Sequence, residues 1–297
     1  MHKNRYLQLD VFADRPGGGN PLGVVLGADE WSPAAMQSFA AWTGLVETTF
    51  LLRPTSPEAD YRVRIHTPVR EIPFAGHPTV GSAHAALESG LARGRAGLLV
   101  QECAAGLLPI RIEGDDARRV LSVRAPPARI LREGRGEQPL LDSIVSGAAP
   151  GRLGAAFIEG GRRWWLAELA AEATVRNWRP DHAAIAELAR ADDALGLCVF
   201  ARATNPEYEL VVRAFPAGVG IVEDPASGAA NGLIGAFIAL REPDGALARG
   251  YRVSQGRELG RDARIRVRIE GSDAVWVGGR THTVLDAALR WPGEADR

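Results

Sequence analysis

Lysine is almost absent from this chain, and its scarcity excludes several kinds of chemistry. Lysine and arginine together number 35, yet Lys3 is the sole lysine. Schiff-base enzymes, including those that use pyridoxal phosphate, need a lysine amine held inside a pocket. A phosphate-binding P-loop needs its lysine too, and no glycine-rich segment here is followed by one. We therefore expect neither Schiff-base chemistry nor a P-loop.

Cysteine, net charge and long apolar runs are also in short supply. Two cysteines cannot form a disulfide framework. A net charge of -1 gives no electrostatic footprint for nucleic acid or for an anionic membrane. No apolar run approaches the ~20 residues that span a bilayer, and the N-terminal residues contain no apolar signal core. We expect a cytoplasmic protein with no nucleic-acid partner and no membrane partner.

The pattern of apolar residues predicts an α+β protein of two domains. Alternation at period two predicts strands, and small apolar residues at helical spacing predict three main helices, near residues 34–42, 79–88 and 227–241. Prolines and glycines from 125 to 151 predict a linker with one short helix. The domains are therefore placed at 1–127 and 128–297, the alternative being that the C-terminal segment returns to the first domain.

Two segments, one in each half, look alike. Residues 71–77 read EIPFAGH and residues 223–229 read EDPASGA, with an acid, a proline and a glycine at the same offsets. Each segment opens an alanine-rich helix. This match predicts an internal duplication, although it is short enough for chance to remain the alternative.

The two helix starts are candidate binding sites for a carboxylate. The first turn of a helix has unpaired N–H groups and partial positive charge, which favour anions. Gly76 and Gly228 would let a ligand approach the backbone closely. The alternative is that proline and glycine only begin two helices.

Glu47 is the candidate acid–base group. It lies within an apolar, strand-forming run, residues 44–52, where a carboxylate is costly to bury unless it is paired or protonated. Burial would raise its pKa toward neutrality, which suits a group that accepts and returns a proton. The alternative is an edge-strand glutamate that points at water.

His77, directly after Gly76, could hydrogen-bond a substrate or relay a proton, or it could be purely structural. His84 follows on the same helical face, but zinc needs three or four ligands and no third is near, so we expect no metal. Ser227, His77 and Asp224 supply the residue types of a hydrolase triad. Their spacing does not match a nucleophile elbow, so that assignment is rejected.

At these residues the sequence resembles the phenazine-biosynthesis PhzF-like family, which has the diaminopimelate-epimerase-like fold. The resemblance rests on an ordered set of motifs, residues 19–21, 47–50, 67–79 and 223–228. It implies two similar domains, each an antiparallel sheet wrapped around a central helix, with the active site in the cleft between them. It also implies a homodimer and no cofactor.

The resemblance also assigns roles to residues. A glutamate matching Glu47 shuttles a proton in the phenazine enzyme, and residues matching His77 and Asp224 contact the substrate. We therefore predict Glu47, His77 and Asp224 as the catalytic residues. We predict substrate-binding roles for four more residues: Asn20, Gly76, Ser227 and Gly228.

Two departures limit what the resemblance implies. Related two-base epimerases carry cysteines where this chain has Ala75 and Ser227, so a thiol pair is not expected. The phenazine enzyme has a substrate-binding serine where this chain has Ala229. We predict a cofactor-independent isomerase or epimerase of a small, cyclic amino or hydroxy carboxylate. The missing hydroxyl at Ala229 argues against an anthranilate-type substrate. The alternative function is a catalytically silent small-molecule-binding or scaffold protein.

Overall fold

The computed structural model describes residues 4–115, 118–271 and 274–291. The chain forms two compact units: unit 1 consists of residues 1–124 and 278–297, and unit 2 of residues 125–277. The predicted α+β class with two domains is confirmed. The units divide at 124/125, three residues before the predicted 127/128. The C-terminal segment returns to unit 1, as the stated alternative had it, because the last strand pairs with the first.

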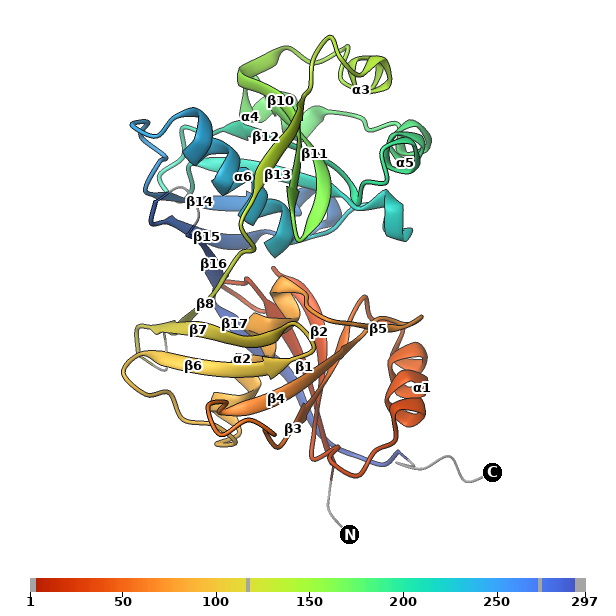
Figure 1. Ribbon diagram of the computed structural model, residues 1–297, viewed down its shortest axis with the longest axis vertical. Coiled ribbons are helices and arrows are strands. Elements are labelled where there is room, and N and C mark those ends of the chain that lie inside the picture. The colour runs from red at the N-terminus through yellow and green to blue at the C-terminus, as the bar shows by residue number, and fades with distance from the viewer. Residues whose placement is uncertain (1–3, 116–117, 272–273, 292–297) are drawn as a thin grey trace. The chain divides into compact units, whose positions relative to one another are not determined.

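Unit 1 contains eleven of the described elements (Figure 1). In chain order they are β1 (Asn4–Val11), β2 (Asn20–Leu26), α1 (Pro33–Thr43), β3 (Thr48–Leu52), β4 (Tyr61–His66), β5 (Glu71–Ile72), α2 (Gly76–Glu88), β6 (Leu98–Cys103), β7 (Gly106–Glu113), β8 (Val120–Arg124) and β17 (Thr281–Leu289).

Unit 2 contains the remaining described elements. They are β9 (Arg129–Glu133), α3 (Pro139–Ile144), β10 (Pro150–Gly160), β11 (Arg162–Leu169), α4 (Glu172–Asn177), α5 (His182–Ala191), β12 (Gly196–Arg202), β13 (Leu210–Phe215), the 3₁₀ turn η1 (Ala217–Val219), α6 (Gly228–Arg241), β14 (Gly250–Gln255), the 3₁₀ turn η2 (Arg257–Leu259), β15 (Ala263–Ile269) and β16 (Val275–Gly279), whose last two residues belong to unit 1.

The same series of strand pairings occurs in both units. In unit 1, β1/β2 is antiparallel, β2/β3 parallel, β3/β4 antiparallel, β4/β6 parallel and β6/β7 antiparallel. In unit 2, β10/β11, β11/β12, β12/β13, β13/β14 and β14/β15 repeat that order. The sheets are therefore mixed rather than wholly antiparallel, because a helical crossover joins each parallel pair. This repetition supports the predicted duplication.

One helix occupies the centre of each unit. Helix α2 connects the parallel strands β4 and β6 and contacts β1, β2, β3, β4, β6, β8 and β17. Helix α6 connects β13 and β14 and contacts β10, β11 and β15. Most residues of both helices are buried, and many are alanine or glycine, because large side chains would not fit between the helix and the surrounding strands. At Gly81, for example, an added Cβ would lie 2.4 Å from Leu22 Cδ2.

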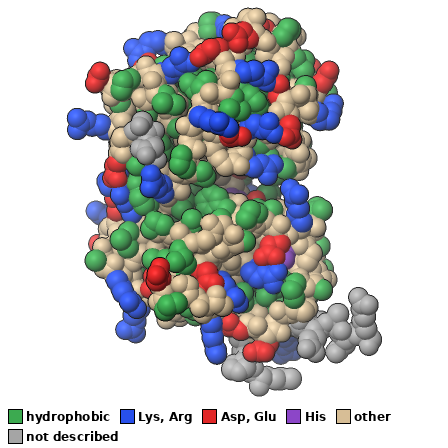
Figure 2. Space-filling view, in the orientation of Figure 1, with side chains coloured by type: hydrophobic (Ala, Val, Ile, Leu, Met, Phe, Trp, Pro, Cys, Tyr) green, Lys and Arg blue, Asp and Glu red, His purple; other side chains and the backbone are tan. Residues whose placement is uncertain are grey.

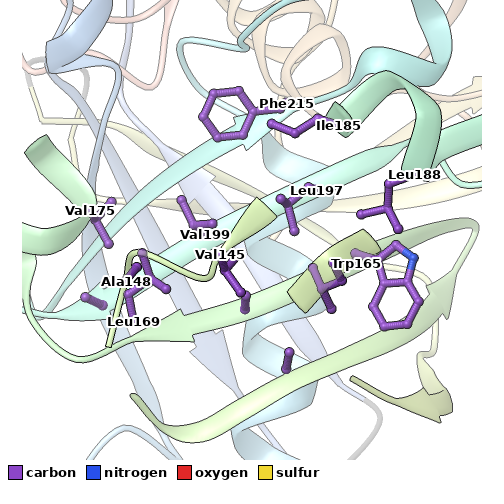
Figure 3. Packing of buried hydrophobic residues seen from close by; sticks show 14 of the residues in the cluster. Val145, Ala148, Trp165, Leu169, Val175, Ile185, Leu188, Leu197, Val199 and Phe215 are labelled. Atoms are coloured by element: carbon purple, nitrogen blue, oxygen red, sulfur yellow. The ribbon is translucent and has the colours of Figure 1, made fainter. Parts of the chain in front are cut away.

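A second apolar layer covers the other face of each sheet. In unit 1, Trp31, Met36 and Phe39 of the α1 region pack on Phe50 and Leu52 of β3. In unit 2, helices α3 to α5 cover β11, β12 and β13 through a cluster of buried side chains that includes Trp165, Leu197, Val199, Phe215, Ile185 and Leu188 (Figure 3). Each such fully buried side chain stabilises the fold by about 1.5–3 kcal/mol relative to an exposed one.

Several local predictions need correction. The predicted linker at 125–151 is part of unit 2, because β9 pairs with β10. The predicted strand at Glu47 begins one residue later, at Thr48. The helix expected from residue 79 begins at Gly76, and the helix after Ser227 begins at Gly228.

Charged side chains of both signs are interspersed on the face drawn in Figure 2, in keeping with the net charge of -1. Among the described residues, no helix is long and apolar enough to cross a membrane.

Candidate active site

Glu47 lies at the junction between α1 and β3, with its side chain turned toward α2. Helix α1 ends at Gly44, whose left-handed backbone (φ 66°) reverses the chain. Thr48 faces α1, where its hydroxyl contacts that of Thr43 at 3.0 Å. Because side chains alternate along a strand, Thr49 faces the opposite side. Glu47, directly before β3, points to that side too. Thr49 there accepts a hydrogen bond from Ser82 of α2, and Glu47 meets His77.

His77 is the second residue of α2, and both of its ring nitrogens have a polar neighbour. Nε2 lies 3.4 Å from Glu47 Oε2, with only 13% of the glutamate side chain exposed. Nδ1 lies 3.4 Å from Nδ2 of Asn20. Burial lowers the pKa of His77 from 6.5 to about 3, since an imidazolium is poorly solvated there. His77 is therefore a neutral imidazole at physiological pH.

Asn20 is held in place by a carboxylate that was not singled out in the sequence. Both oxygens of Asp10, in β1, accept the Gly19 N–H, at 3.0 and 3.1 Å. A side chain at Gly19 would not fit, because its Cβ would lie 2.1 Å from Val11 O. Asp10 and Asn20 are both 2% exposed. The sequence signal for Asp10 was an aspartate on a strand near a glycine-rich turn. The alternation of apolar residues that predicts β1 does not show that Asp10 is buried.

The predicted residues of unit 2 lie at the start of α6. Asp224 Oδ1 accepts the Ala226 N–H at 3.1 Å, which stabilises the turn before the helix. Ser227 is the N-cap of α6, its hydroxyl accepting the Ala230 N–H at 3.3 Å. Gly228 is the first, buried residue of the helix. Asp224 and Ser227 thus have clear local structural roles.

Two further buried residues of unit 2, Gln255 and Asn231, secure this helix start. Gln255 donates to Asp224 O at 2.8 Å and accepts from Ser227 N at 3.3 Å. Asn231 donates both to Ser227 O and to Gln255 Oε1. Sequence reasoning missed both, because Gln255 lies more than twenty residues from its partners and no short motif links them.

The structure thus brings Asn20, Glu47 and His77 together within unit 1, with Gly76 adjacent to His77, and gathers the other three predicted residues within unit 2. A single site formed from both units stays a prediction. Among the described residues, no group of three or more His, Cys, Asp or Glu side chains is placed to hold a metal ion.

Comparison with known proteins agrees with this architecture. The profile of the family described as "Phenazine biosynthesis-like protein" matches residues 9–287. The chain belongs to this family. Trans-2,3-dihydro-3-hydroxyanthranilate isomerase of Pseudomonas aeruginosa is 33% identical, over 92% of this chain and 92% of the relative.

Two further relatives of the family match along nearly their whole length. "Antisense-enhancing sequence 1" of Schizosaccharomyces pombe is 33% identical over 96% of this chain and 98% of its own length. A PhzF-family crystal structure from Bacillus anthracis superposes with a TM-score of 0.84 at 26% identity, covering 98% of this chain and all of that one. The predicted assignment to an isomerase or epimerase of this family is confirmed.

Proposed function

We propose that the protein moves a proton on a small carboxylate substrate, with Glu47 as the group that takes the proton and returns it. The observation that carries this proposal is the enclosed contact between Glu47 and neutral His77. A carboxylate largely shielded from water, beside a neutral imidazole, is suited to abstract a proton from carbon. The proton leaves one carbon, the electron pair stays on the substrate, and the proton returns to carbon, so no redox partner is needed.

The substrate class proposed is a small, cyclic amino or hydroxy carboxylate. Its support is the relative from P. aeruginosa, whose name specifies a dihydro-hydroxyanthranilate, together with helix starts that favour anions. Gly76 and the unit 2 residues Asp224, Ser227 and Gly228 are proposed as substrate contacts on the strength of the resemblance. Ala229 carries no hydroxyl, so the ring substituents recognised here are expected to differ from those of the phenazine enzyme.

Deuterium exchange tests the proposal directly. Candidate carboxylates that raise the melting temperature are first selected, since a ligand at ~100 times its dissociation constant stabilises by about 2.7 kcal/mol. Each is then incubated with the protein in heavy water and followed by NMR. A carbon-bound proton should exchange with solvent or appear at a second carbon. A ligand that binds without either change would instead identify a binding protein.

Glu47→Gln is the decisive variant. It keeps size and polarity but removes the base, so the turnover rate should fall by ~10²–10⁴-fold. Stability should not fall, because the neutral amide avoids the desolvation cost of an enclosed carboxylate. Glu58→Gln, at an exposed position of unit 1, is the matched control and should keep wild-type turnover. Near-normal turnover in a folded Glu47→Gln protein would remove Glu47 from the mechanism.

A further inference from the structure

The histidine of the proposed site has a ring orientation with a chemical consequence. A neutral imidazole carries one proton, on either Nδ1 or Nε2, and its neighbours decide which. In His77, Nδ1 faces the amide nitrogen of Asn20 and Nε2 faces the carboxylate of Glu47. An amide nitrogen only donates and a carboxylate only accepts when ionised. Both neighbours therefore favour the same tautomer, with the proton on Nε2.

We propose that Asn20 is a positioning residue that holds the proton of His77 on Nε2, the ring nitrogen that lies 3.4 Å from Glu47 Oε2. This inference rests on the proposed function and is additional to the predicted role of Asn20 in substrate binding. Asn20 acts through His77: its N–H occupies the Nδ1 lone pair, so the proton-bearing nitrogen faces the base. An N–H on the side of the ring that faces Glu47 favours one orientation of the carboxylate and leaves its other lone pairs for the substrate proton.

The surroundings of Asn20 are rigid enough for this role. Asn20 begins β2 opposite Val11 of β1, and its neighbour Gly19 donates to both oxygens of Asp10. The side chain is enclosed, at 2% exposure, so water does not compete freely for the Nδ1 lone pair. The sequence Gly19-Asn20 thus combines a close backbone approach with an amide aimed at α2.

Nitrogen-15 NMR of the ring tests the tautomer independently of turnover. The full-length protein, uniformly labelled with ¹⁵N, has six histidines, and the signals of His77 are those lost in His77→Gln. At neutral pH, the wild-type spectrum should show a protonated Nε2 and an unprotonated Nδ1. A protonated Nδ1, or a rapidly exchanging mixture, would overturn the inference without any further variant.

Asn20→Asp sharpens the test, because a carboxylate accepts where the amide donates. The proton should then move to Nδ1, or occupy both nitrogens, and the exchange rate of substrate should fall on the order of 10²-fold through misorientation. Asn205→Asp makes the same charge change in a turn of unit 2, where the side chain accepts from Glu207 N and can still do so. It should leave the His77 spectrum and the exchange rate unchanged.

The outcomes separate this inference from the function on which it rests. An unchanged His77 tautomer in folded Asn20→Asp overturns the role of Asn20, even if Glu47→Gln is inactive. A protonated Nε2 in the wild type that is lost in Asn20→Asp supports that role. If Glu47→Gln keeps full turnover at the same time, the proposed function is what fails.

Discussion

The two units share their strand pairings and a central helix, but the side chains near the start of that helix differ. Each unit has an ion pair at the same place, Arg64 of β4 with Glu71 and Arg213 of β13 with Glu223, so the two pairs can be used to align the units. Aligned in this way, Thr48, which pairs with His66, corresponds to Leu197, which pairs with Phe215. Glu47 then corresponds to Gly196.

Unit 2 has no room for a second acid–base group at that position. A Cβ on Gly196 would lie 1.8 Å from Phe215 O, so no side chain fits. Counting from the helix starts, His77 corresponds to Ala229, which carries no polar group. Under the proposed function, the acid–base group would therefore be present in unit 1 alone, since the corresponding positions of unit 2, Gly196 and Ala229, carry no titratable side chain. Three predictions test how far the two units have diverged.

The largest expected difference concerns the two corresponding ion pairs. Arg213 and Glu223 are 6% and 5% exposed, and Arg213 also donates to Trp178 O. Arg213→Met would leave a buried carboxylate unpaired and should cost about 3–5 kcal/mol. In unit 1 the same pair is 25% and 34% exposed, so Arg64→Met should cost about 0–1 kcal/mol. Denaturant titration, with hydrogen exchange to locate the opening, measures both. Equal losses would contradict the comparison.

A smaller effect should appear in the pH dependence of the free energy of unfolding. His77 of unit 1 contributes to it, whereas the corresponding residue of unit 2, Ala229, does not titrate. His77 has a folded pKa of about 3 against 6.5. Between these values the unfolded chain binds more protons, so stability should fall as the pH falls from 6.5 toward 3. The contribution is about 1.4 kcal/mol per pH unit.

Replacing the imidazole by an amide removes this titration. His77→Gln should therefore lose less stability than the wild type between neutral pH and about pH 5, by roughly 2 kcal/mol. Chemical denaturation at several pH values gives the two curves. His66 and His84 also have pKa values lowered by burial, so only the difference between the curves reports on His77. Parallel curves would show that His77 does not remain neutral in the folded protein.

The smallest expected effect is at the helix caps. Ser227→Ala removes the bond to Ala230 N and should cost about 1 kcal/mol. In unit 1 the N-cap is Ala75, and the residue corresponding to Ala230 is Pro78, which has no N–H. Ala75→Ser should therefore change stability by less than about 0.5 kcal/mol. Melting temperatures test the contrast, and a clear gain from Ala75→Ser would show that another backbone N–H donates to the new hydroxyl.

Local patterns in the sequence predicted some elements closely, because the interactions that define those elements are local. The helices predicted near residues 34–42 and 227–241 are α1 (Pro33–Thr43) and α6 (Gly228–Arg241), and both begin after a serine whose hydroxyl accepts a backbone N–H. The strand β11 was missed because residues 164–169 are buried on both faces and show no alternation. Helix α5 had a usable signal, the N-cap Asp181, that was not recognised.

The candidate site shows the same limit. Glu47 and His77 could be chosen from the sequence, because a carboxylate in an apolar run and a histidine after a helix-start glycine are unusual residues in themselves. Their contact depends on strand pairing and on the crossover to α2, so its geometry could not be predicted. The substrate-binding role predicted for Asn20 stays a prediction, and the contact of its amide with His77, 57 positions away, could not be predicted from the sequence.

The return of β17 to unit 1 has a consequence for synthesis on the ribosome. Strand β1 lies between β2 and β17, so the sheet of unit 1 lacks a central pairing until residues 281–289 have left the exit tunnel. Unit 2 is one uninterrupted segment, residues 125–277. Unit 2 can therefore complete its strand pairings before β17 has been made and has paired with β1. We expect unit 2 to fold before unit 1, although most of unit 1 is translated first.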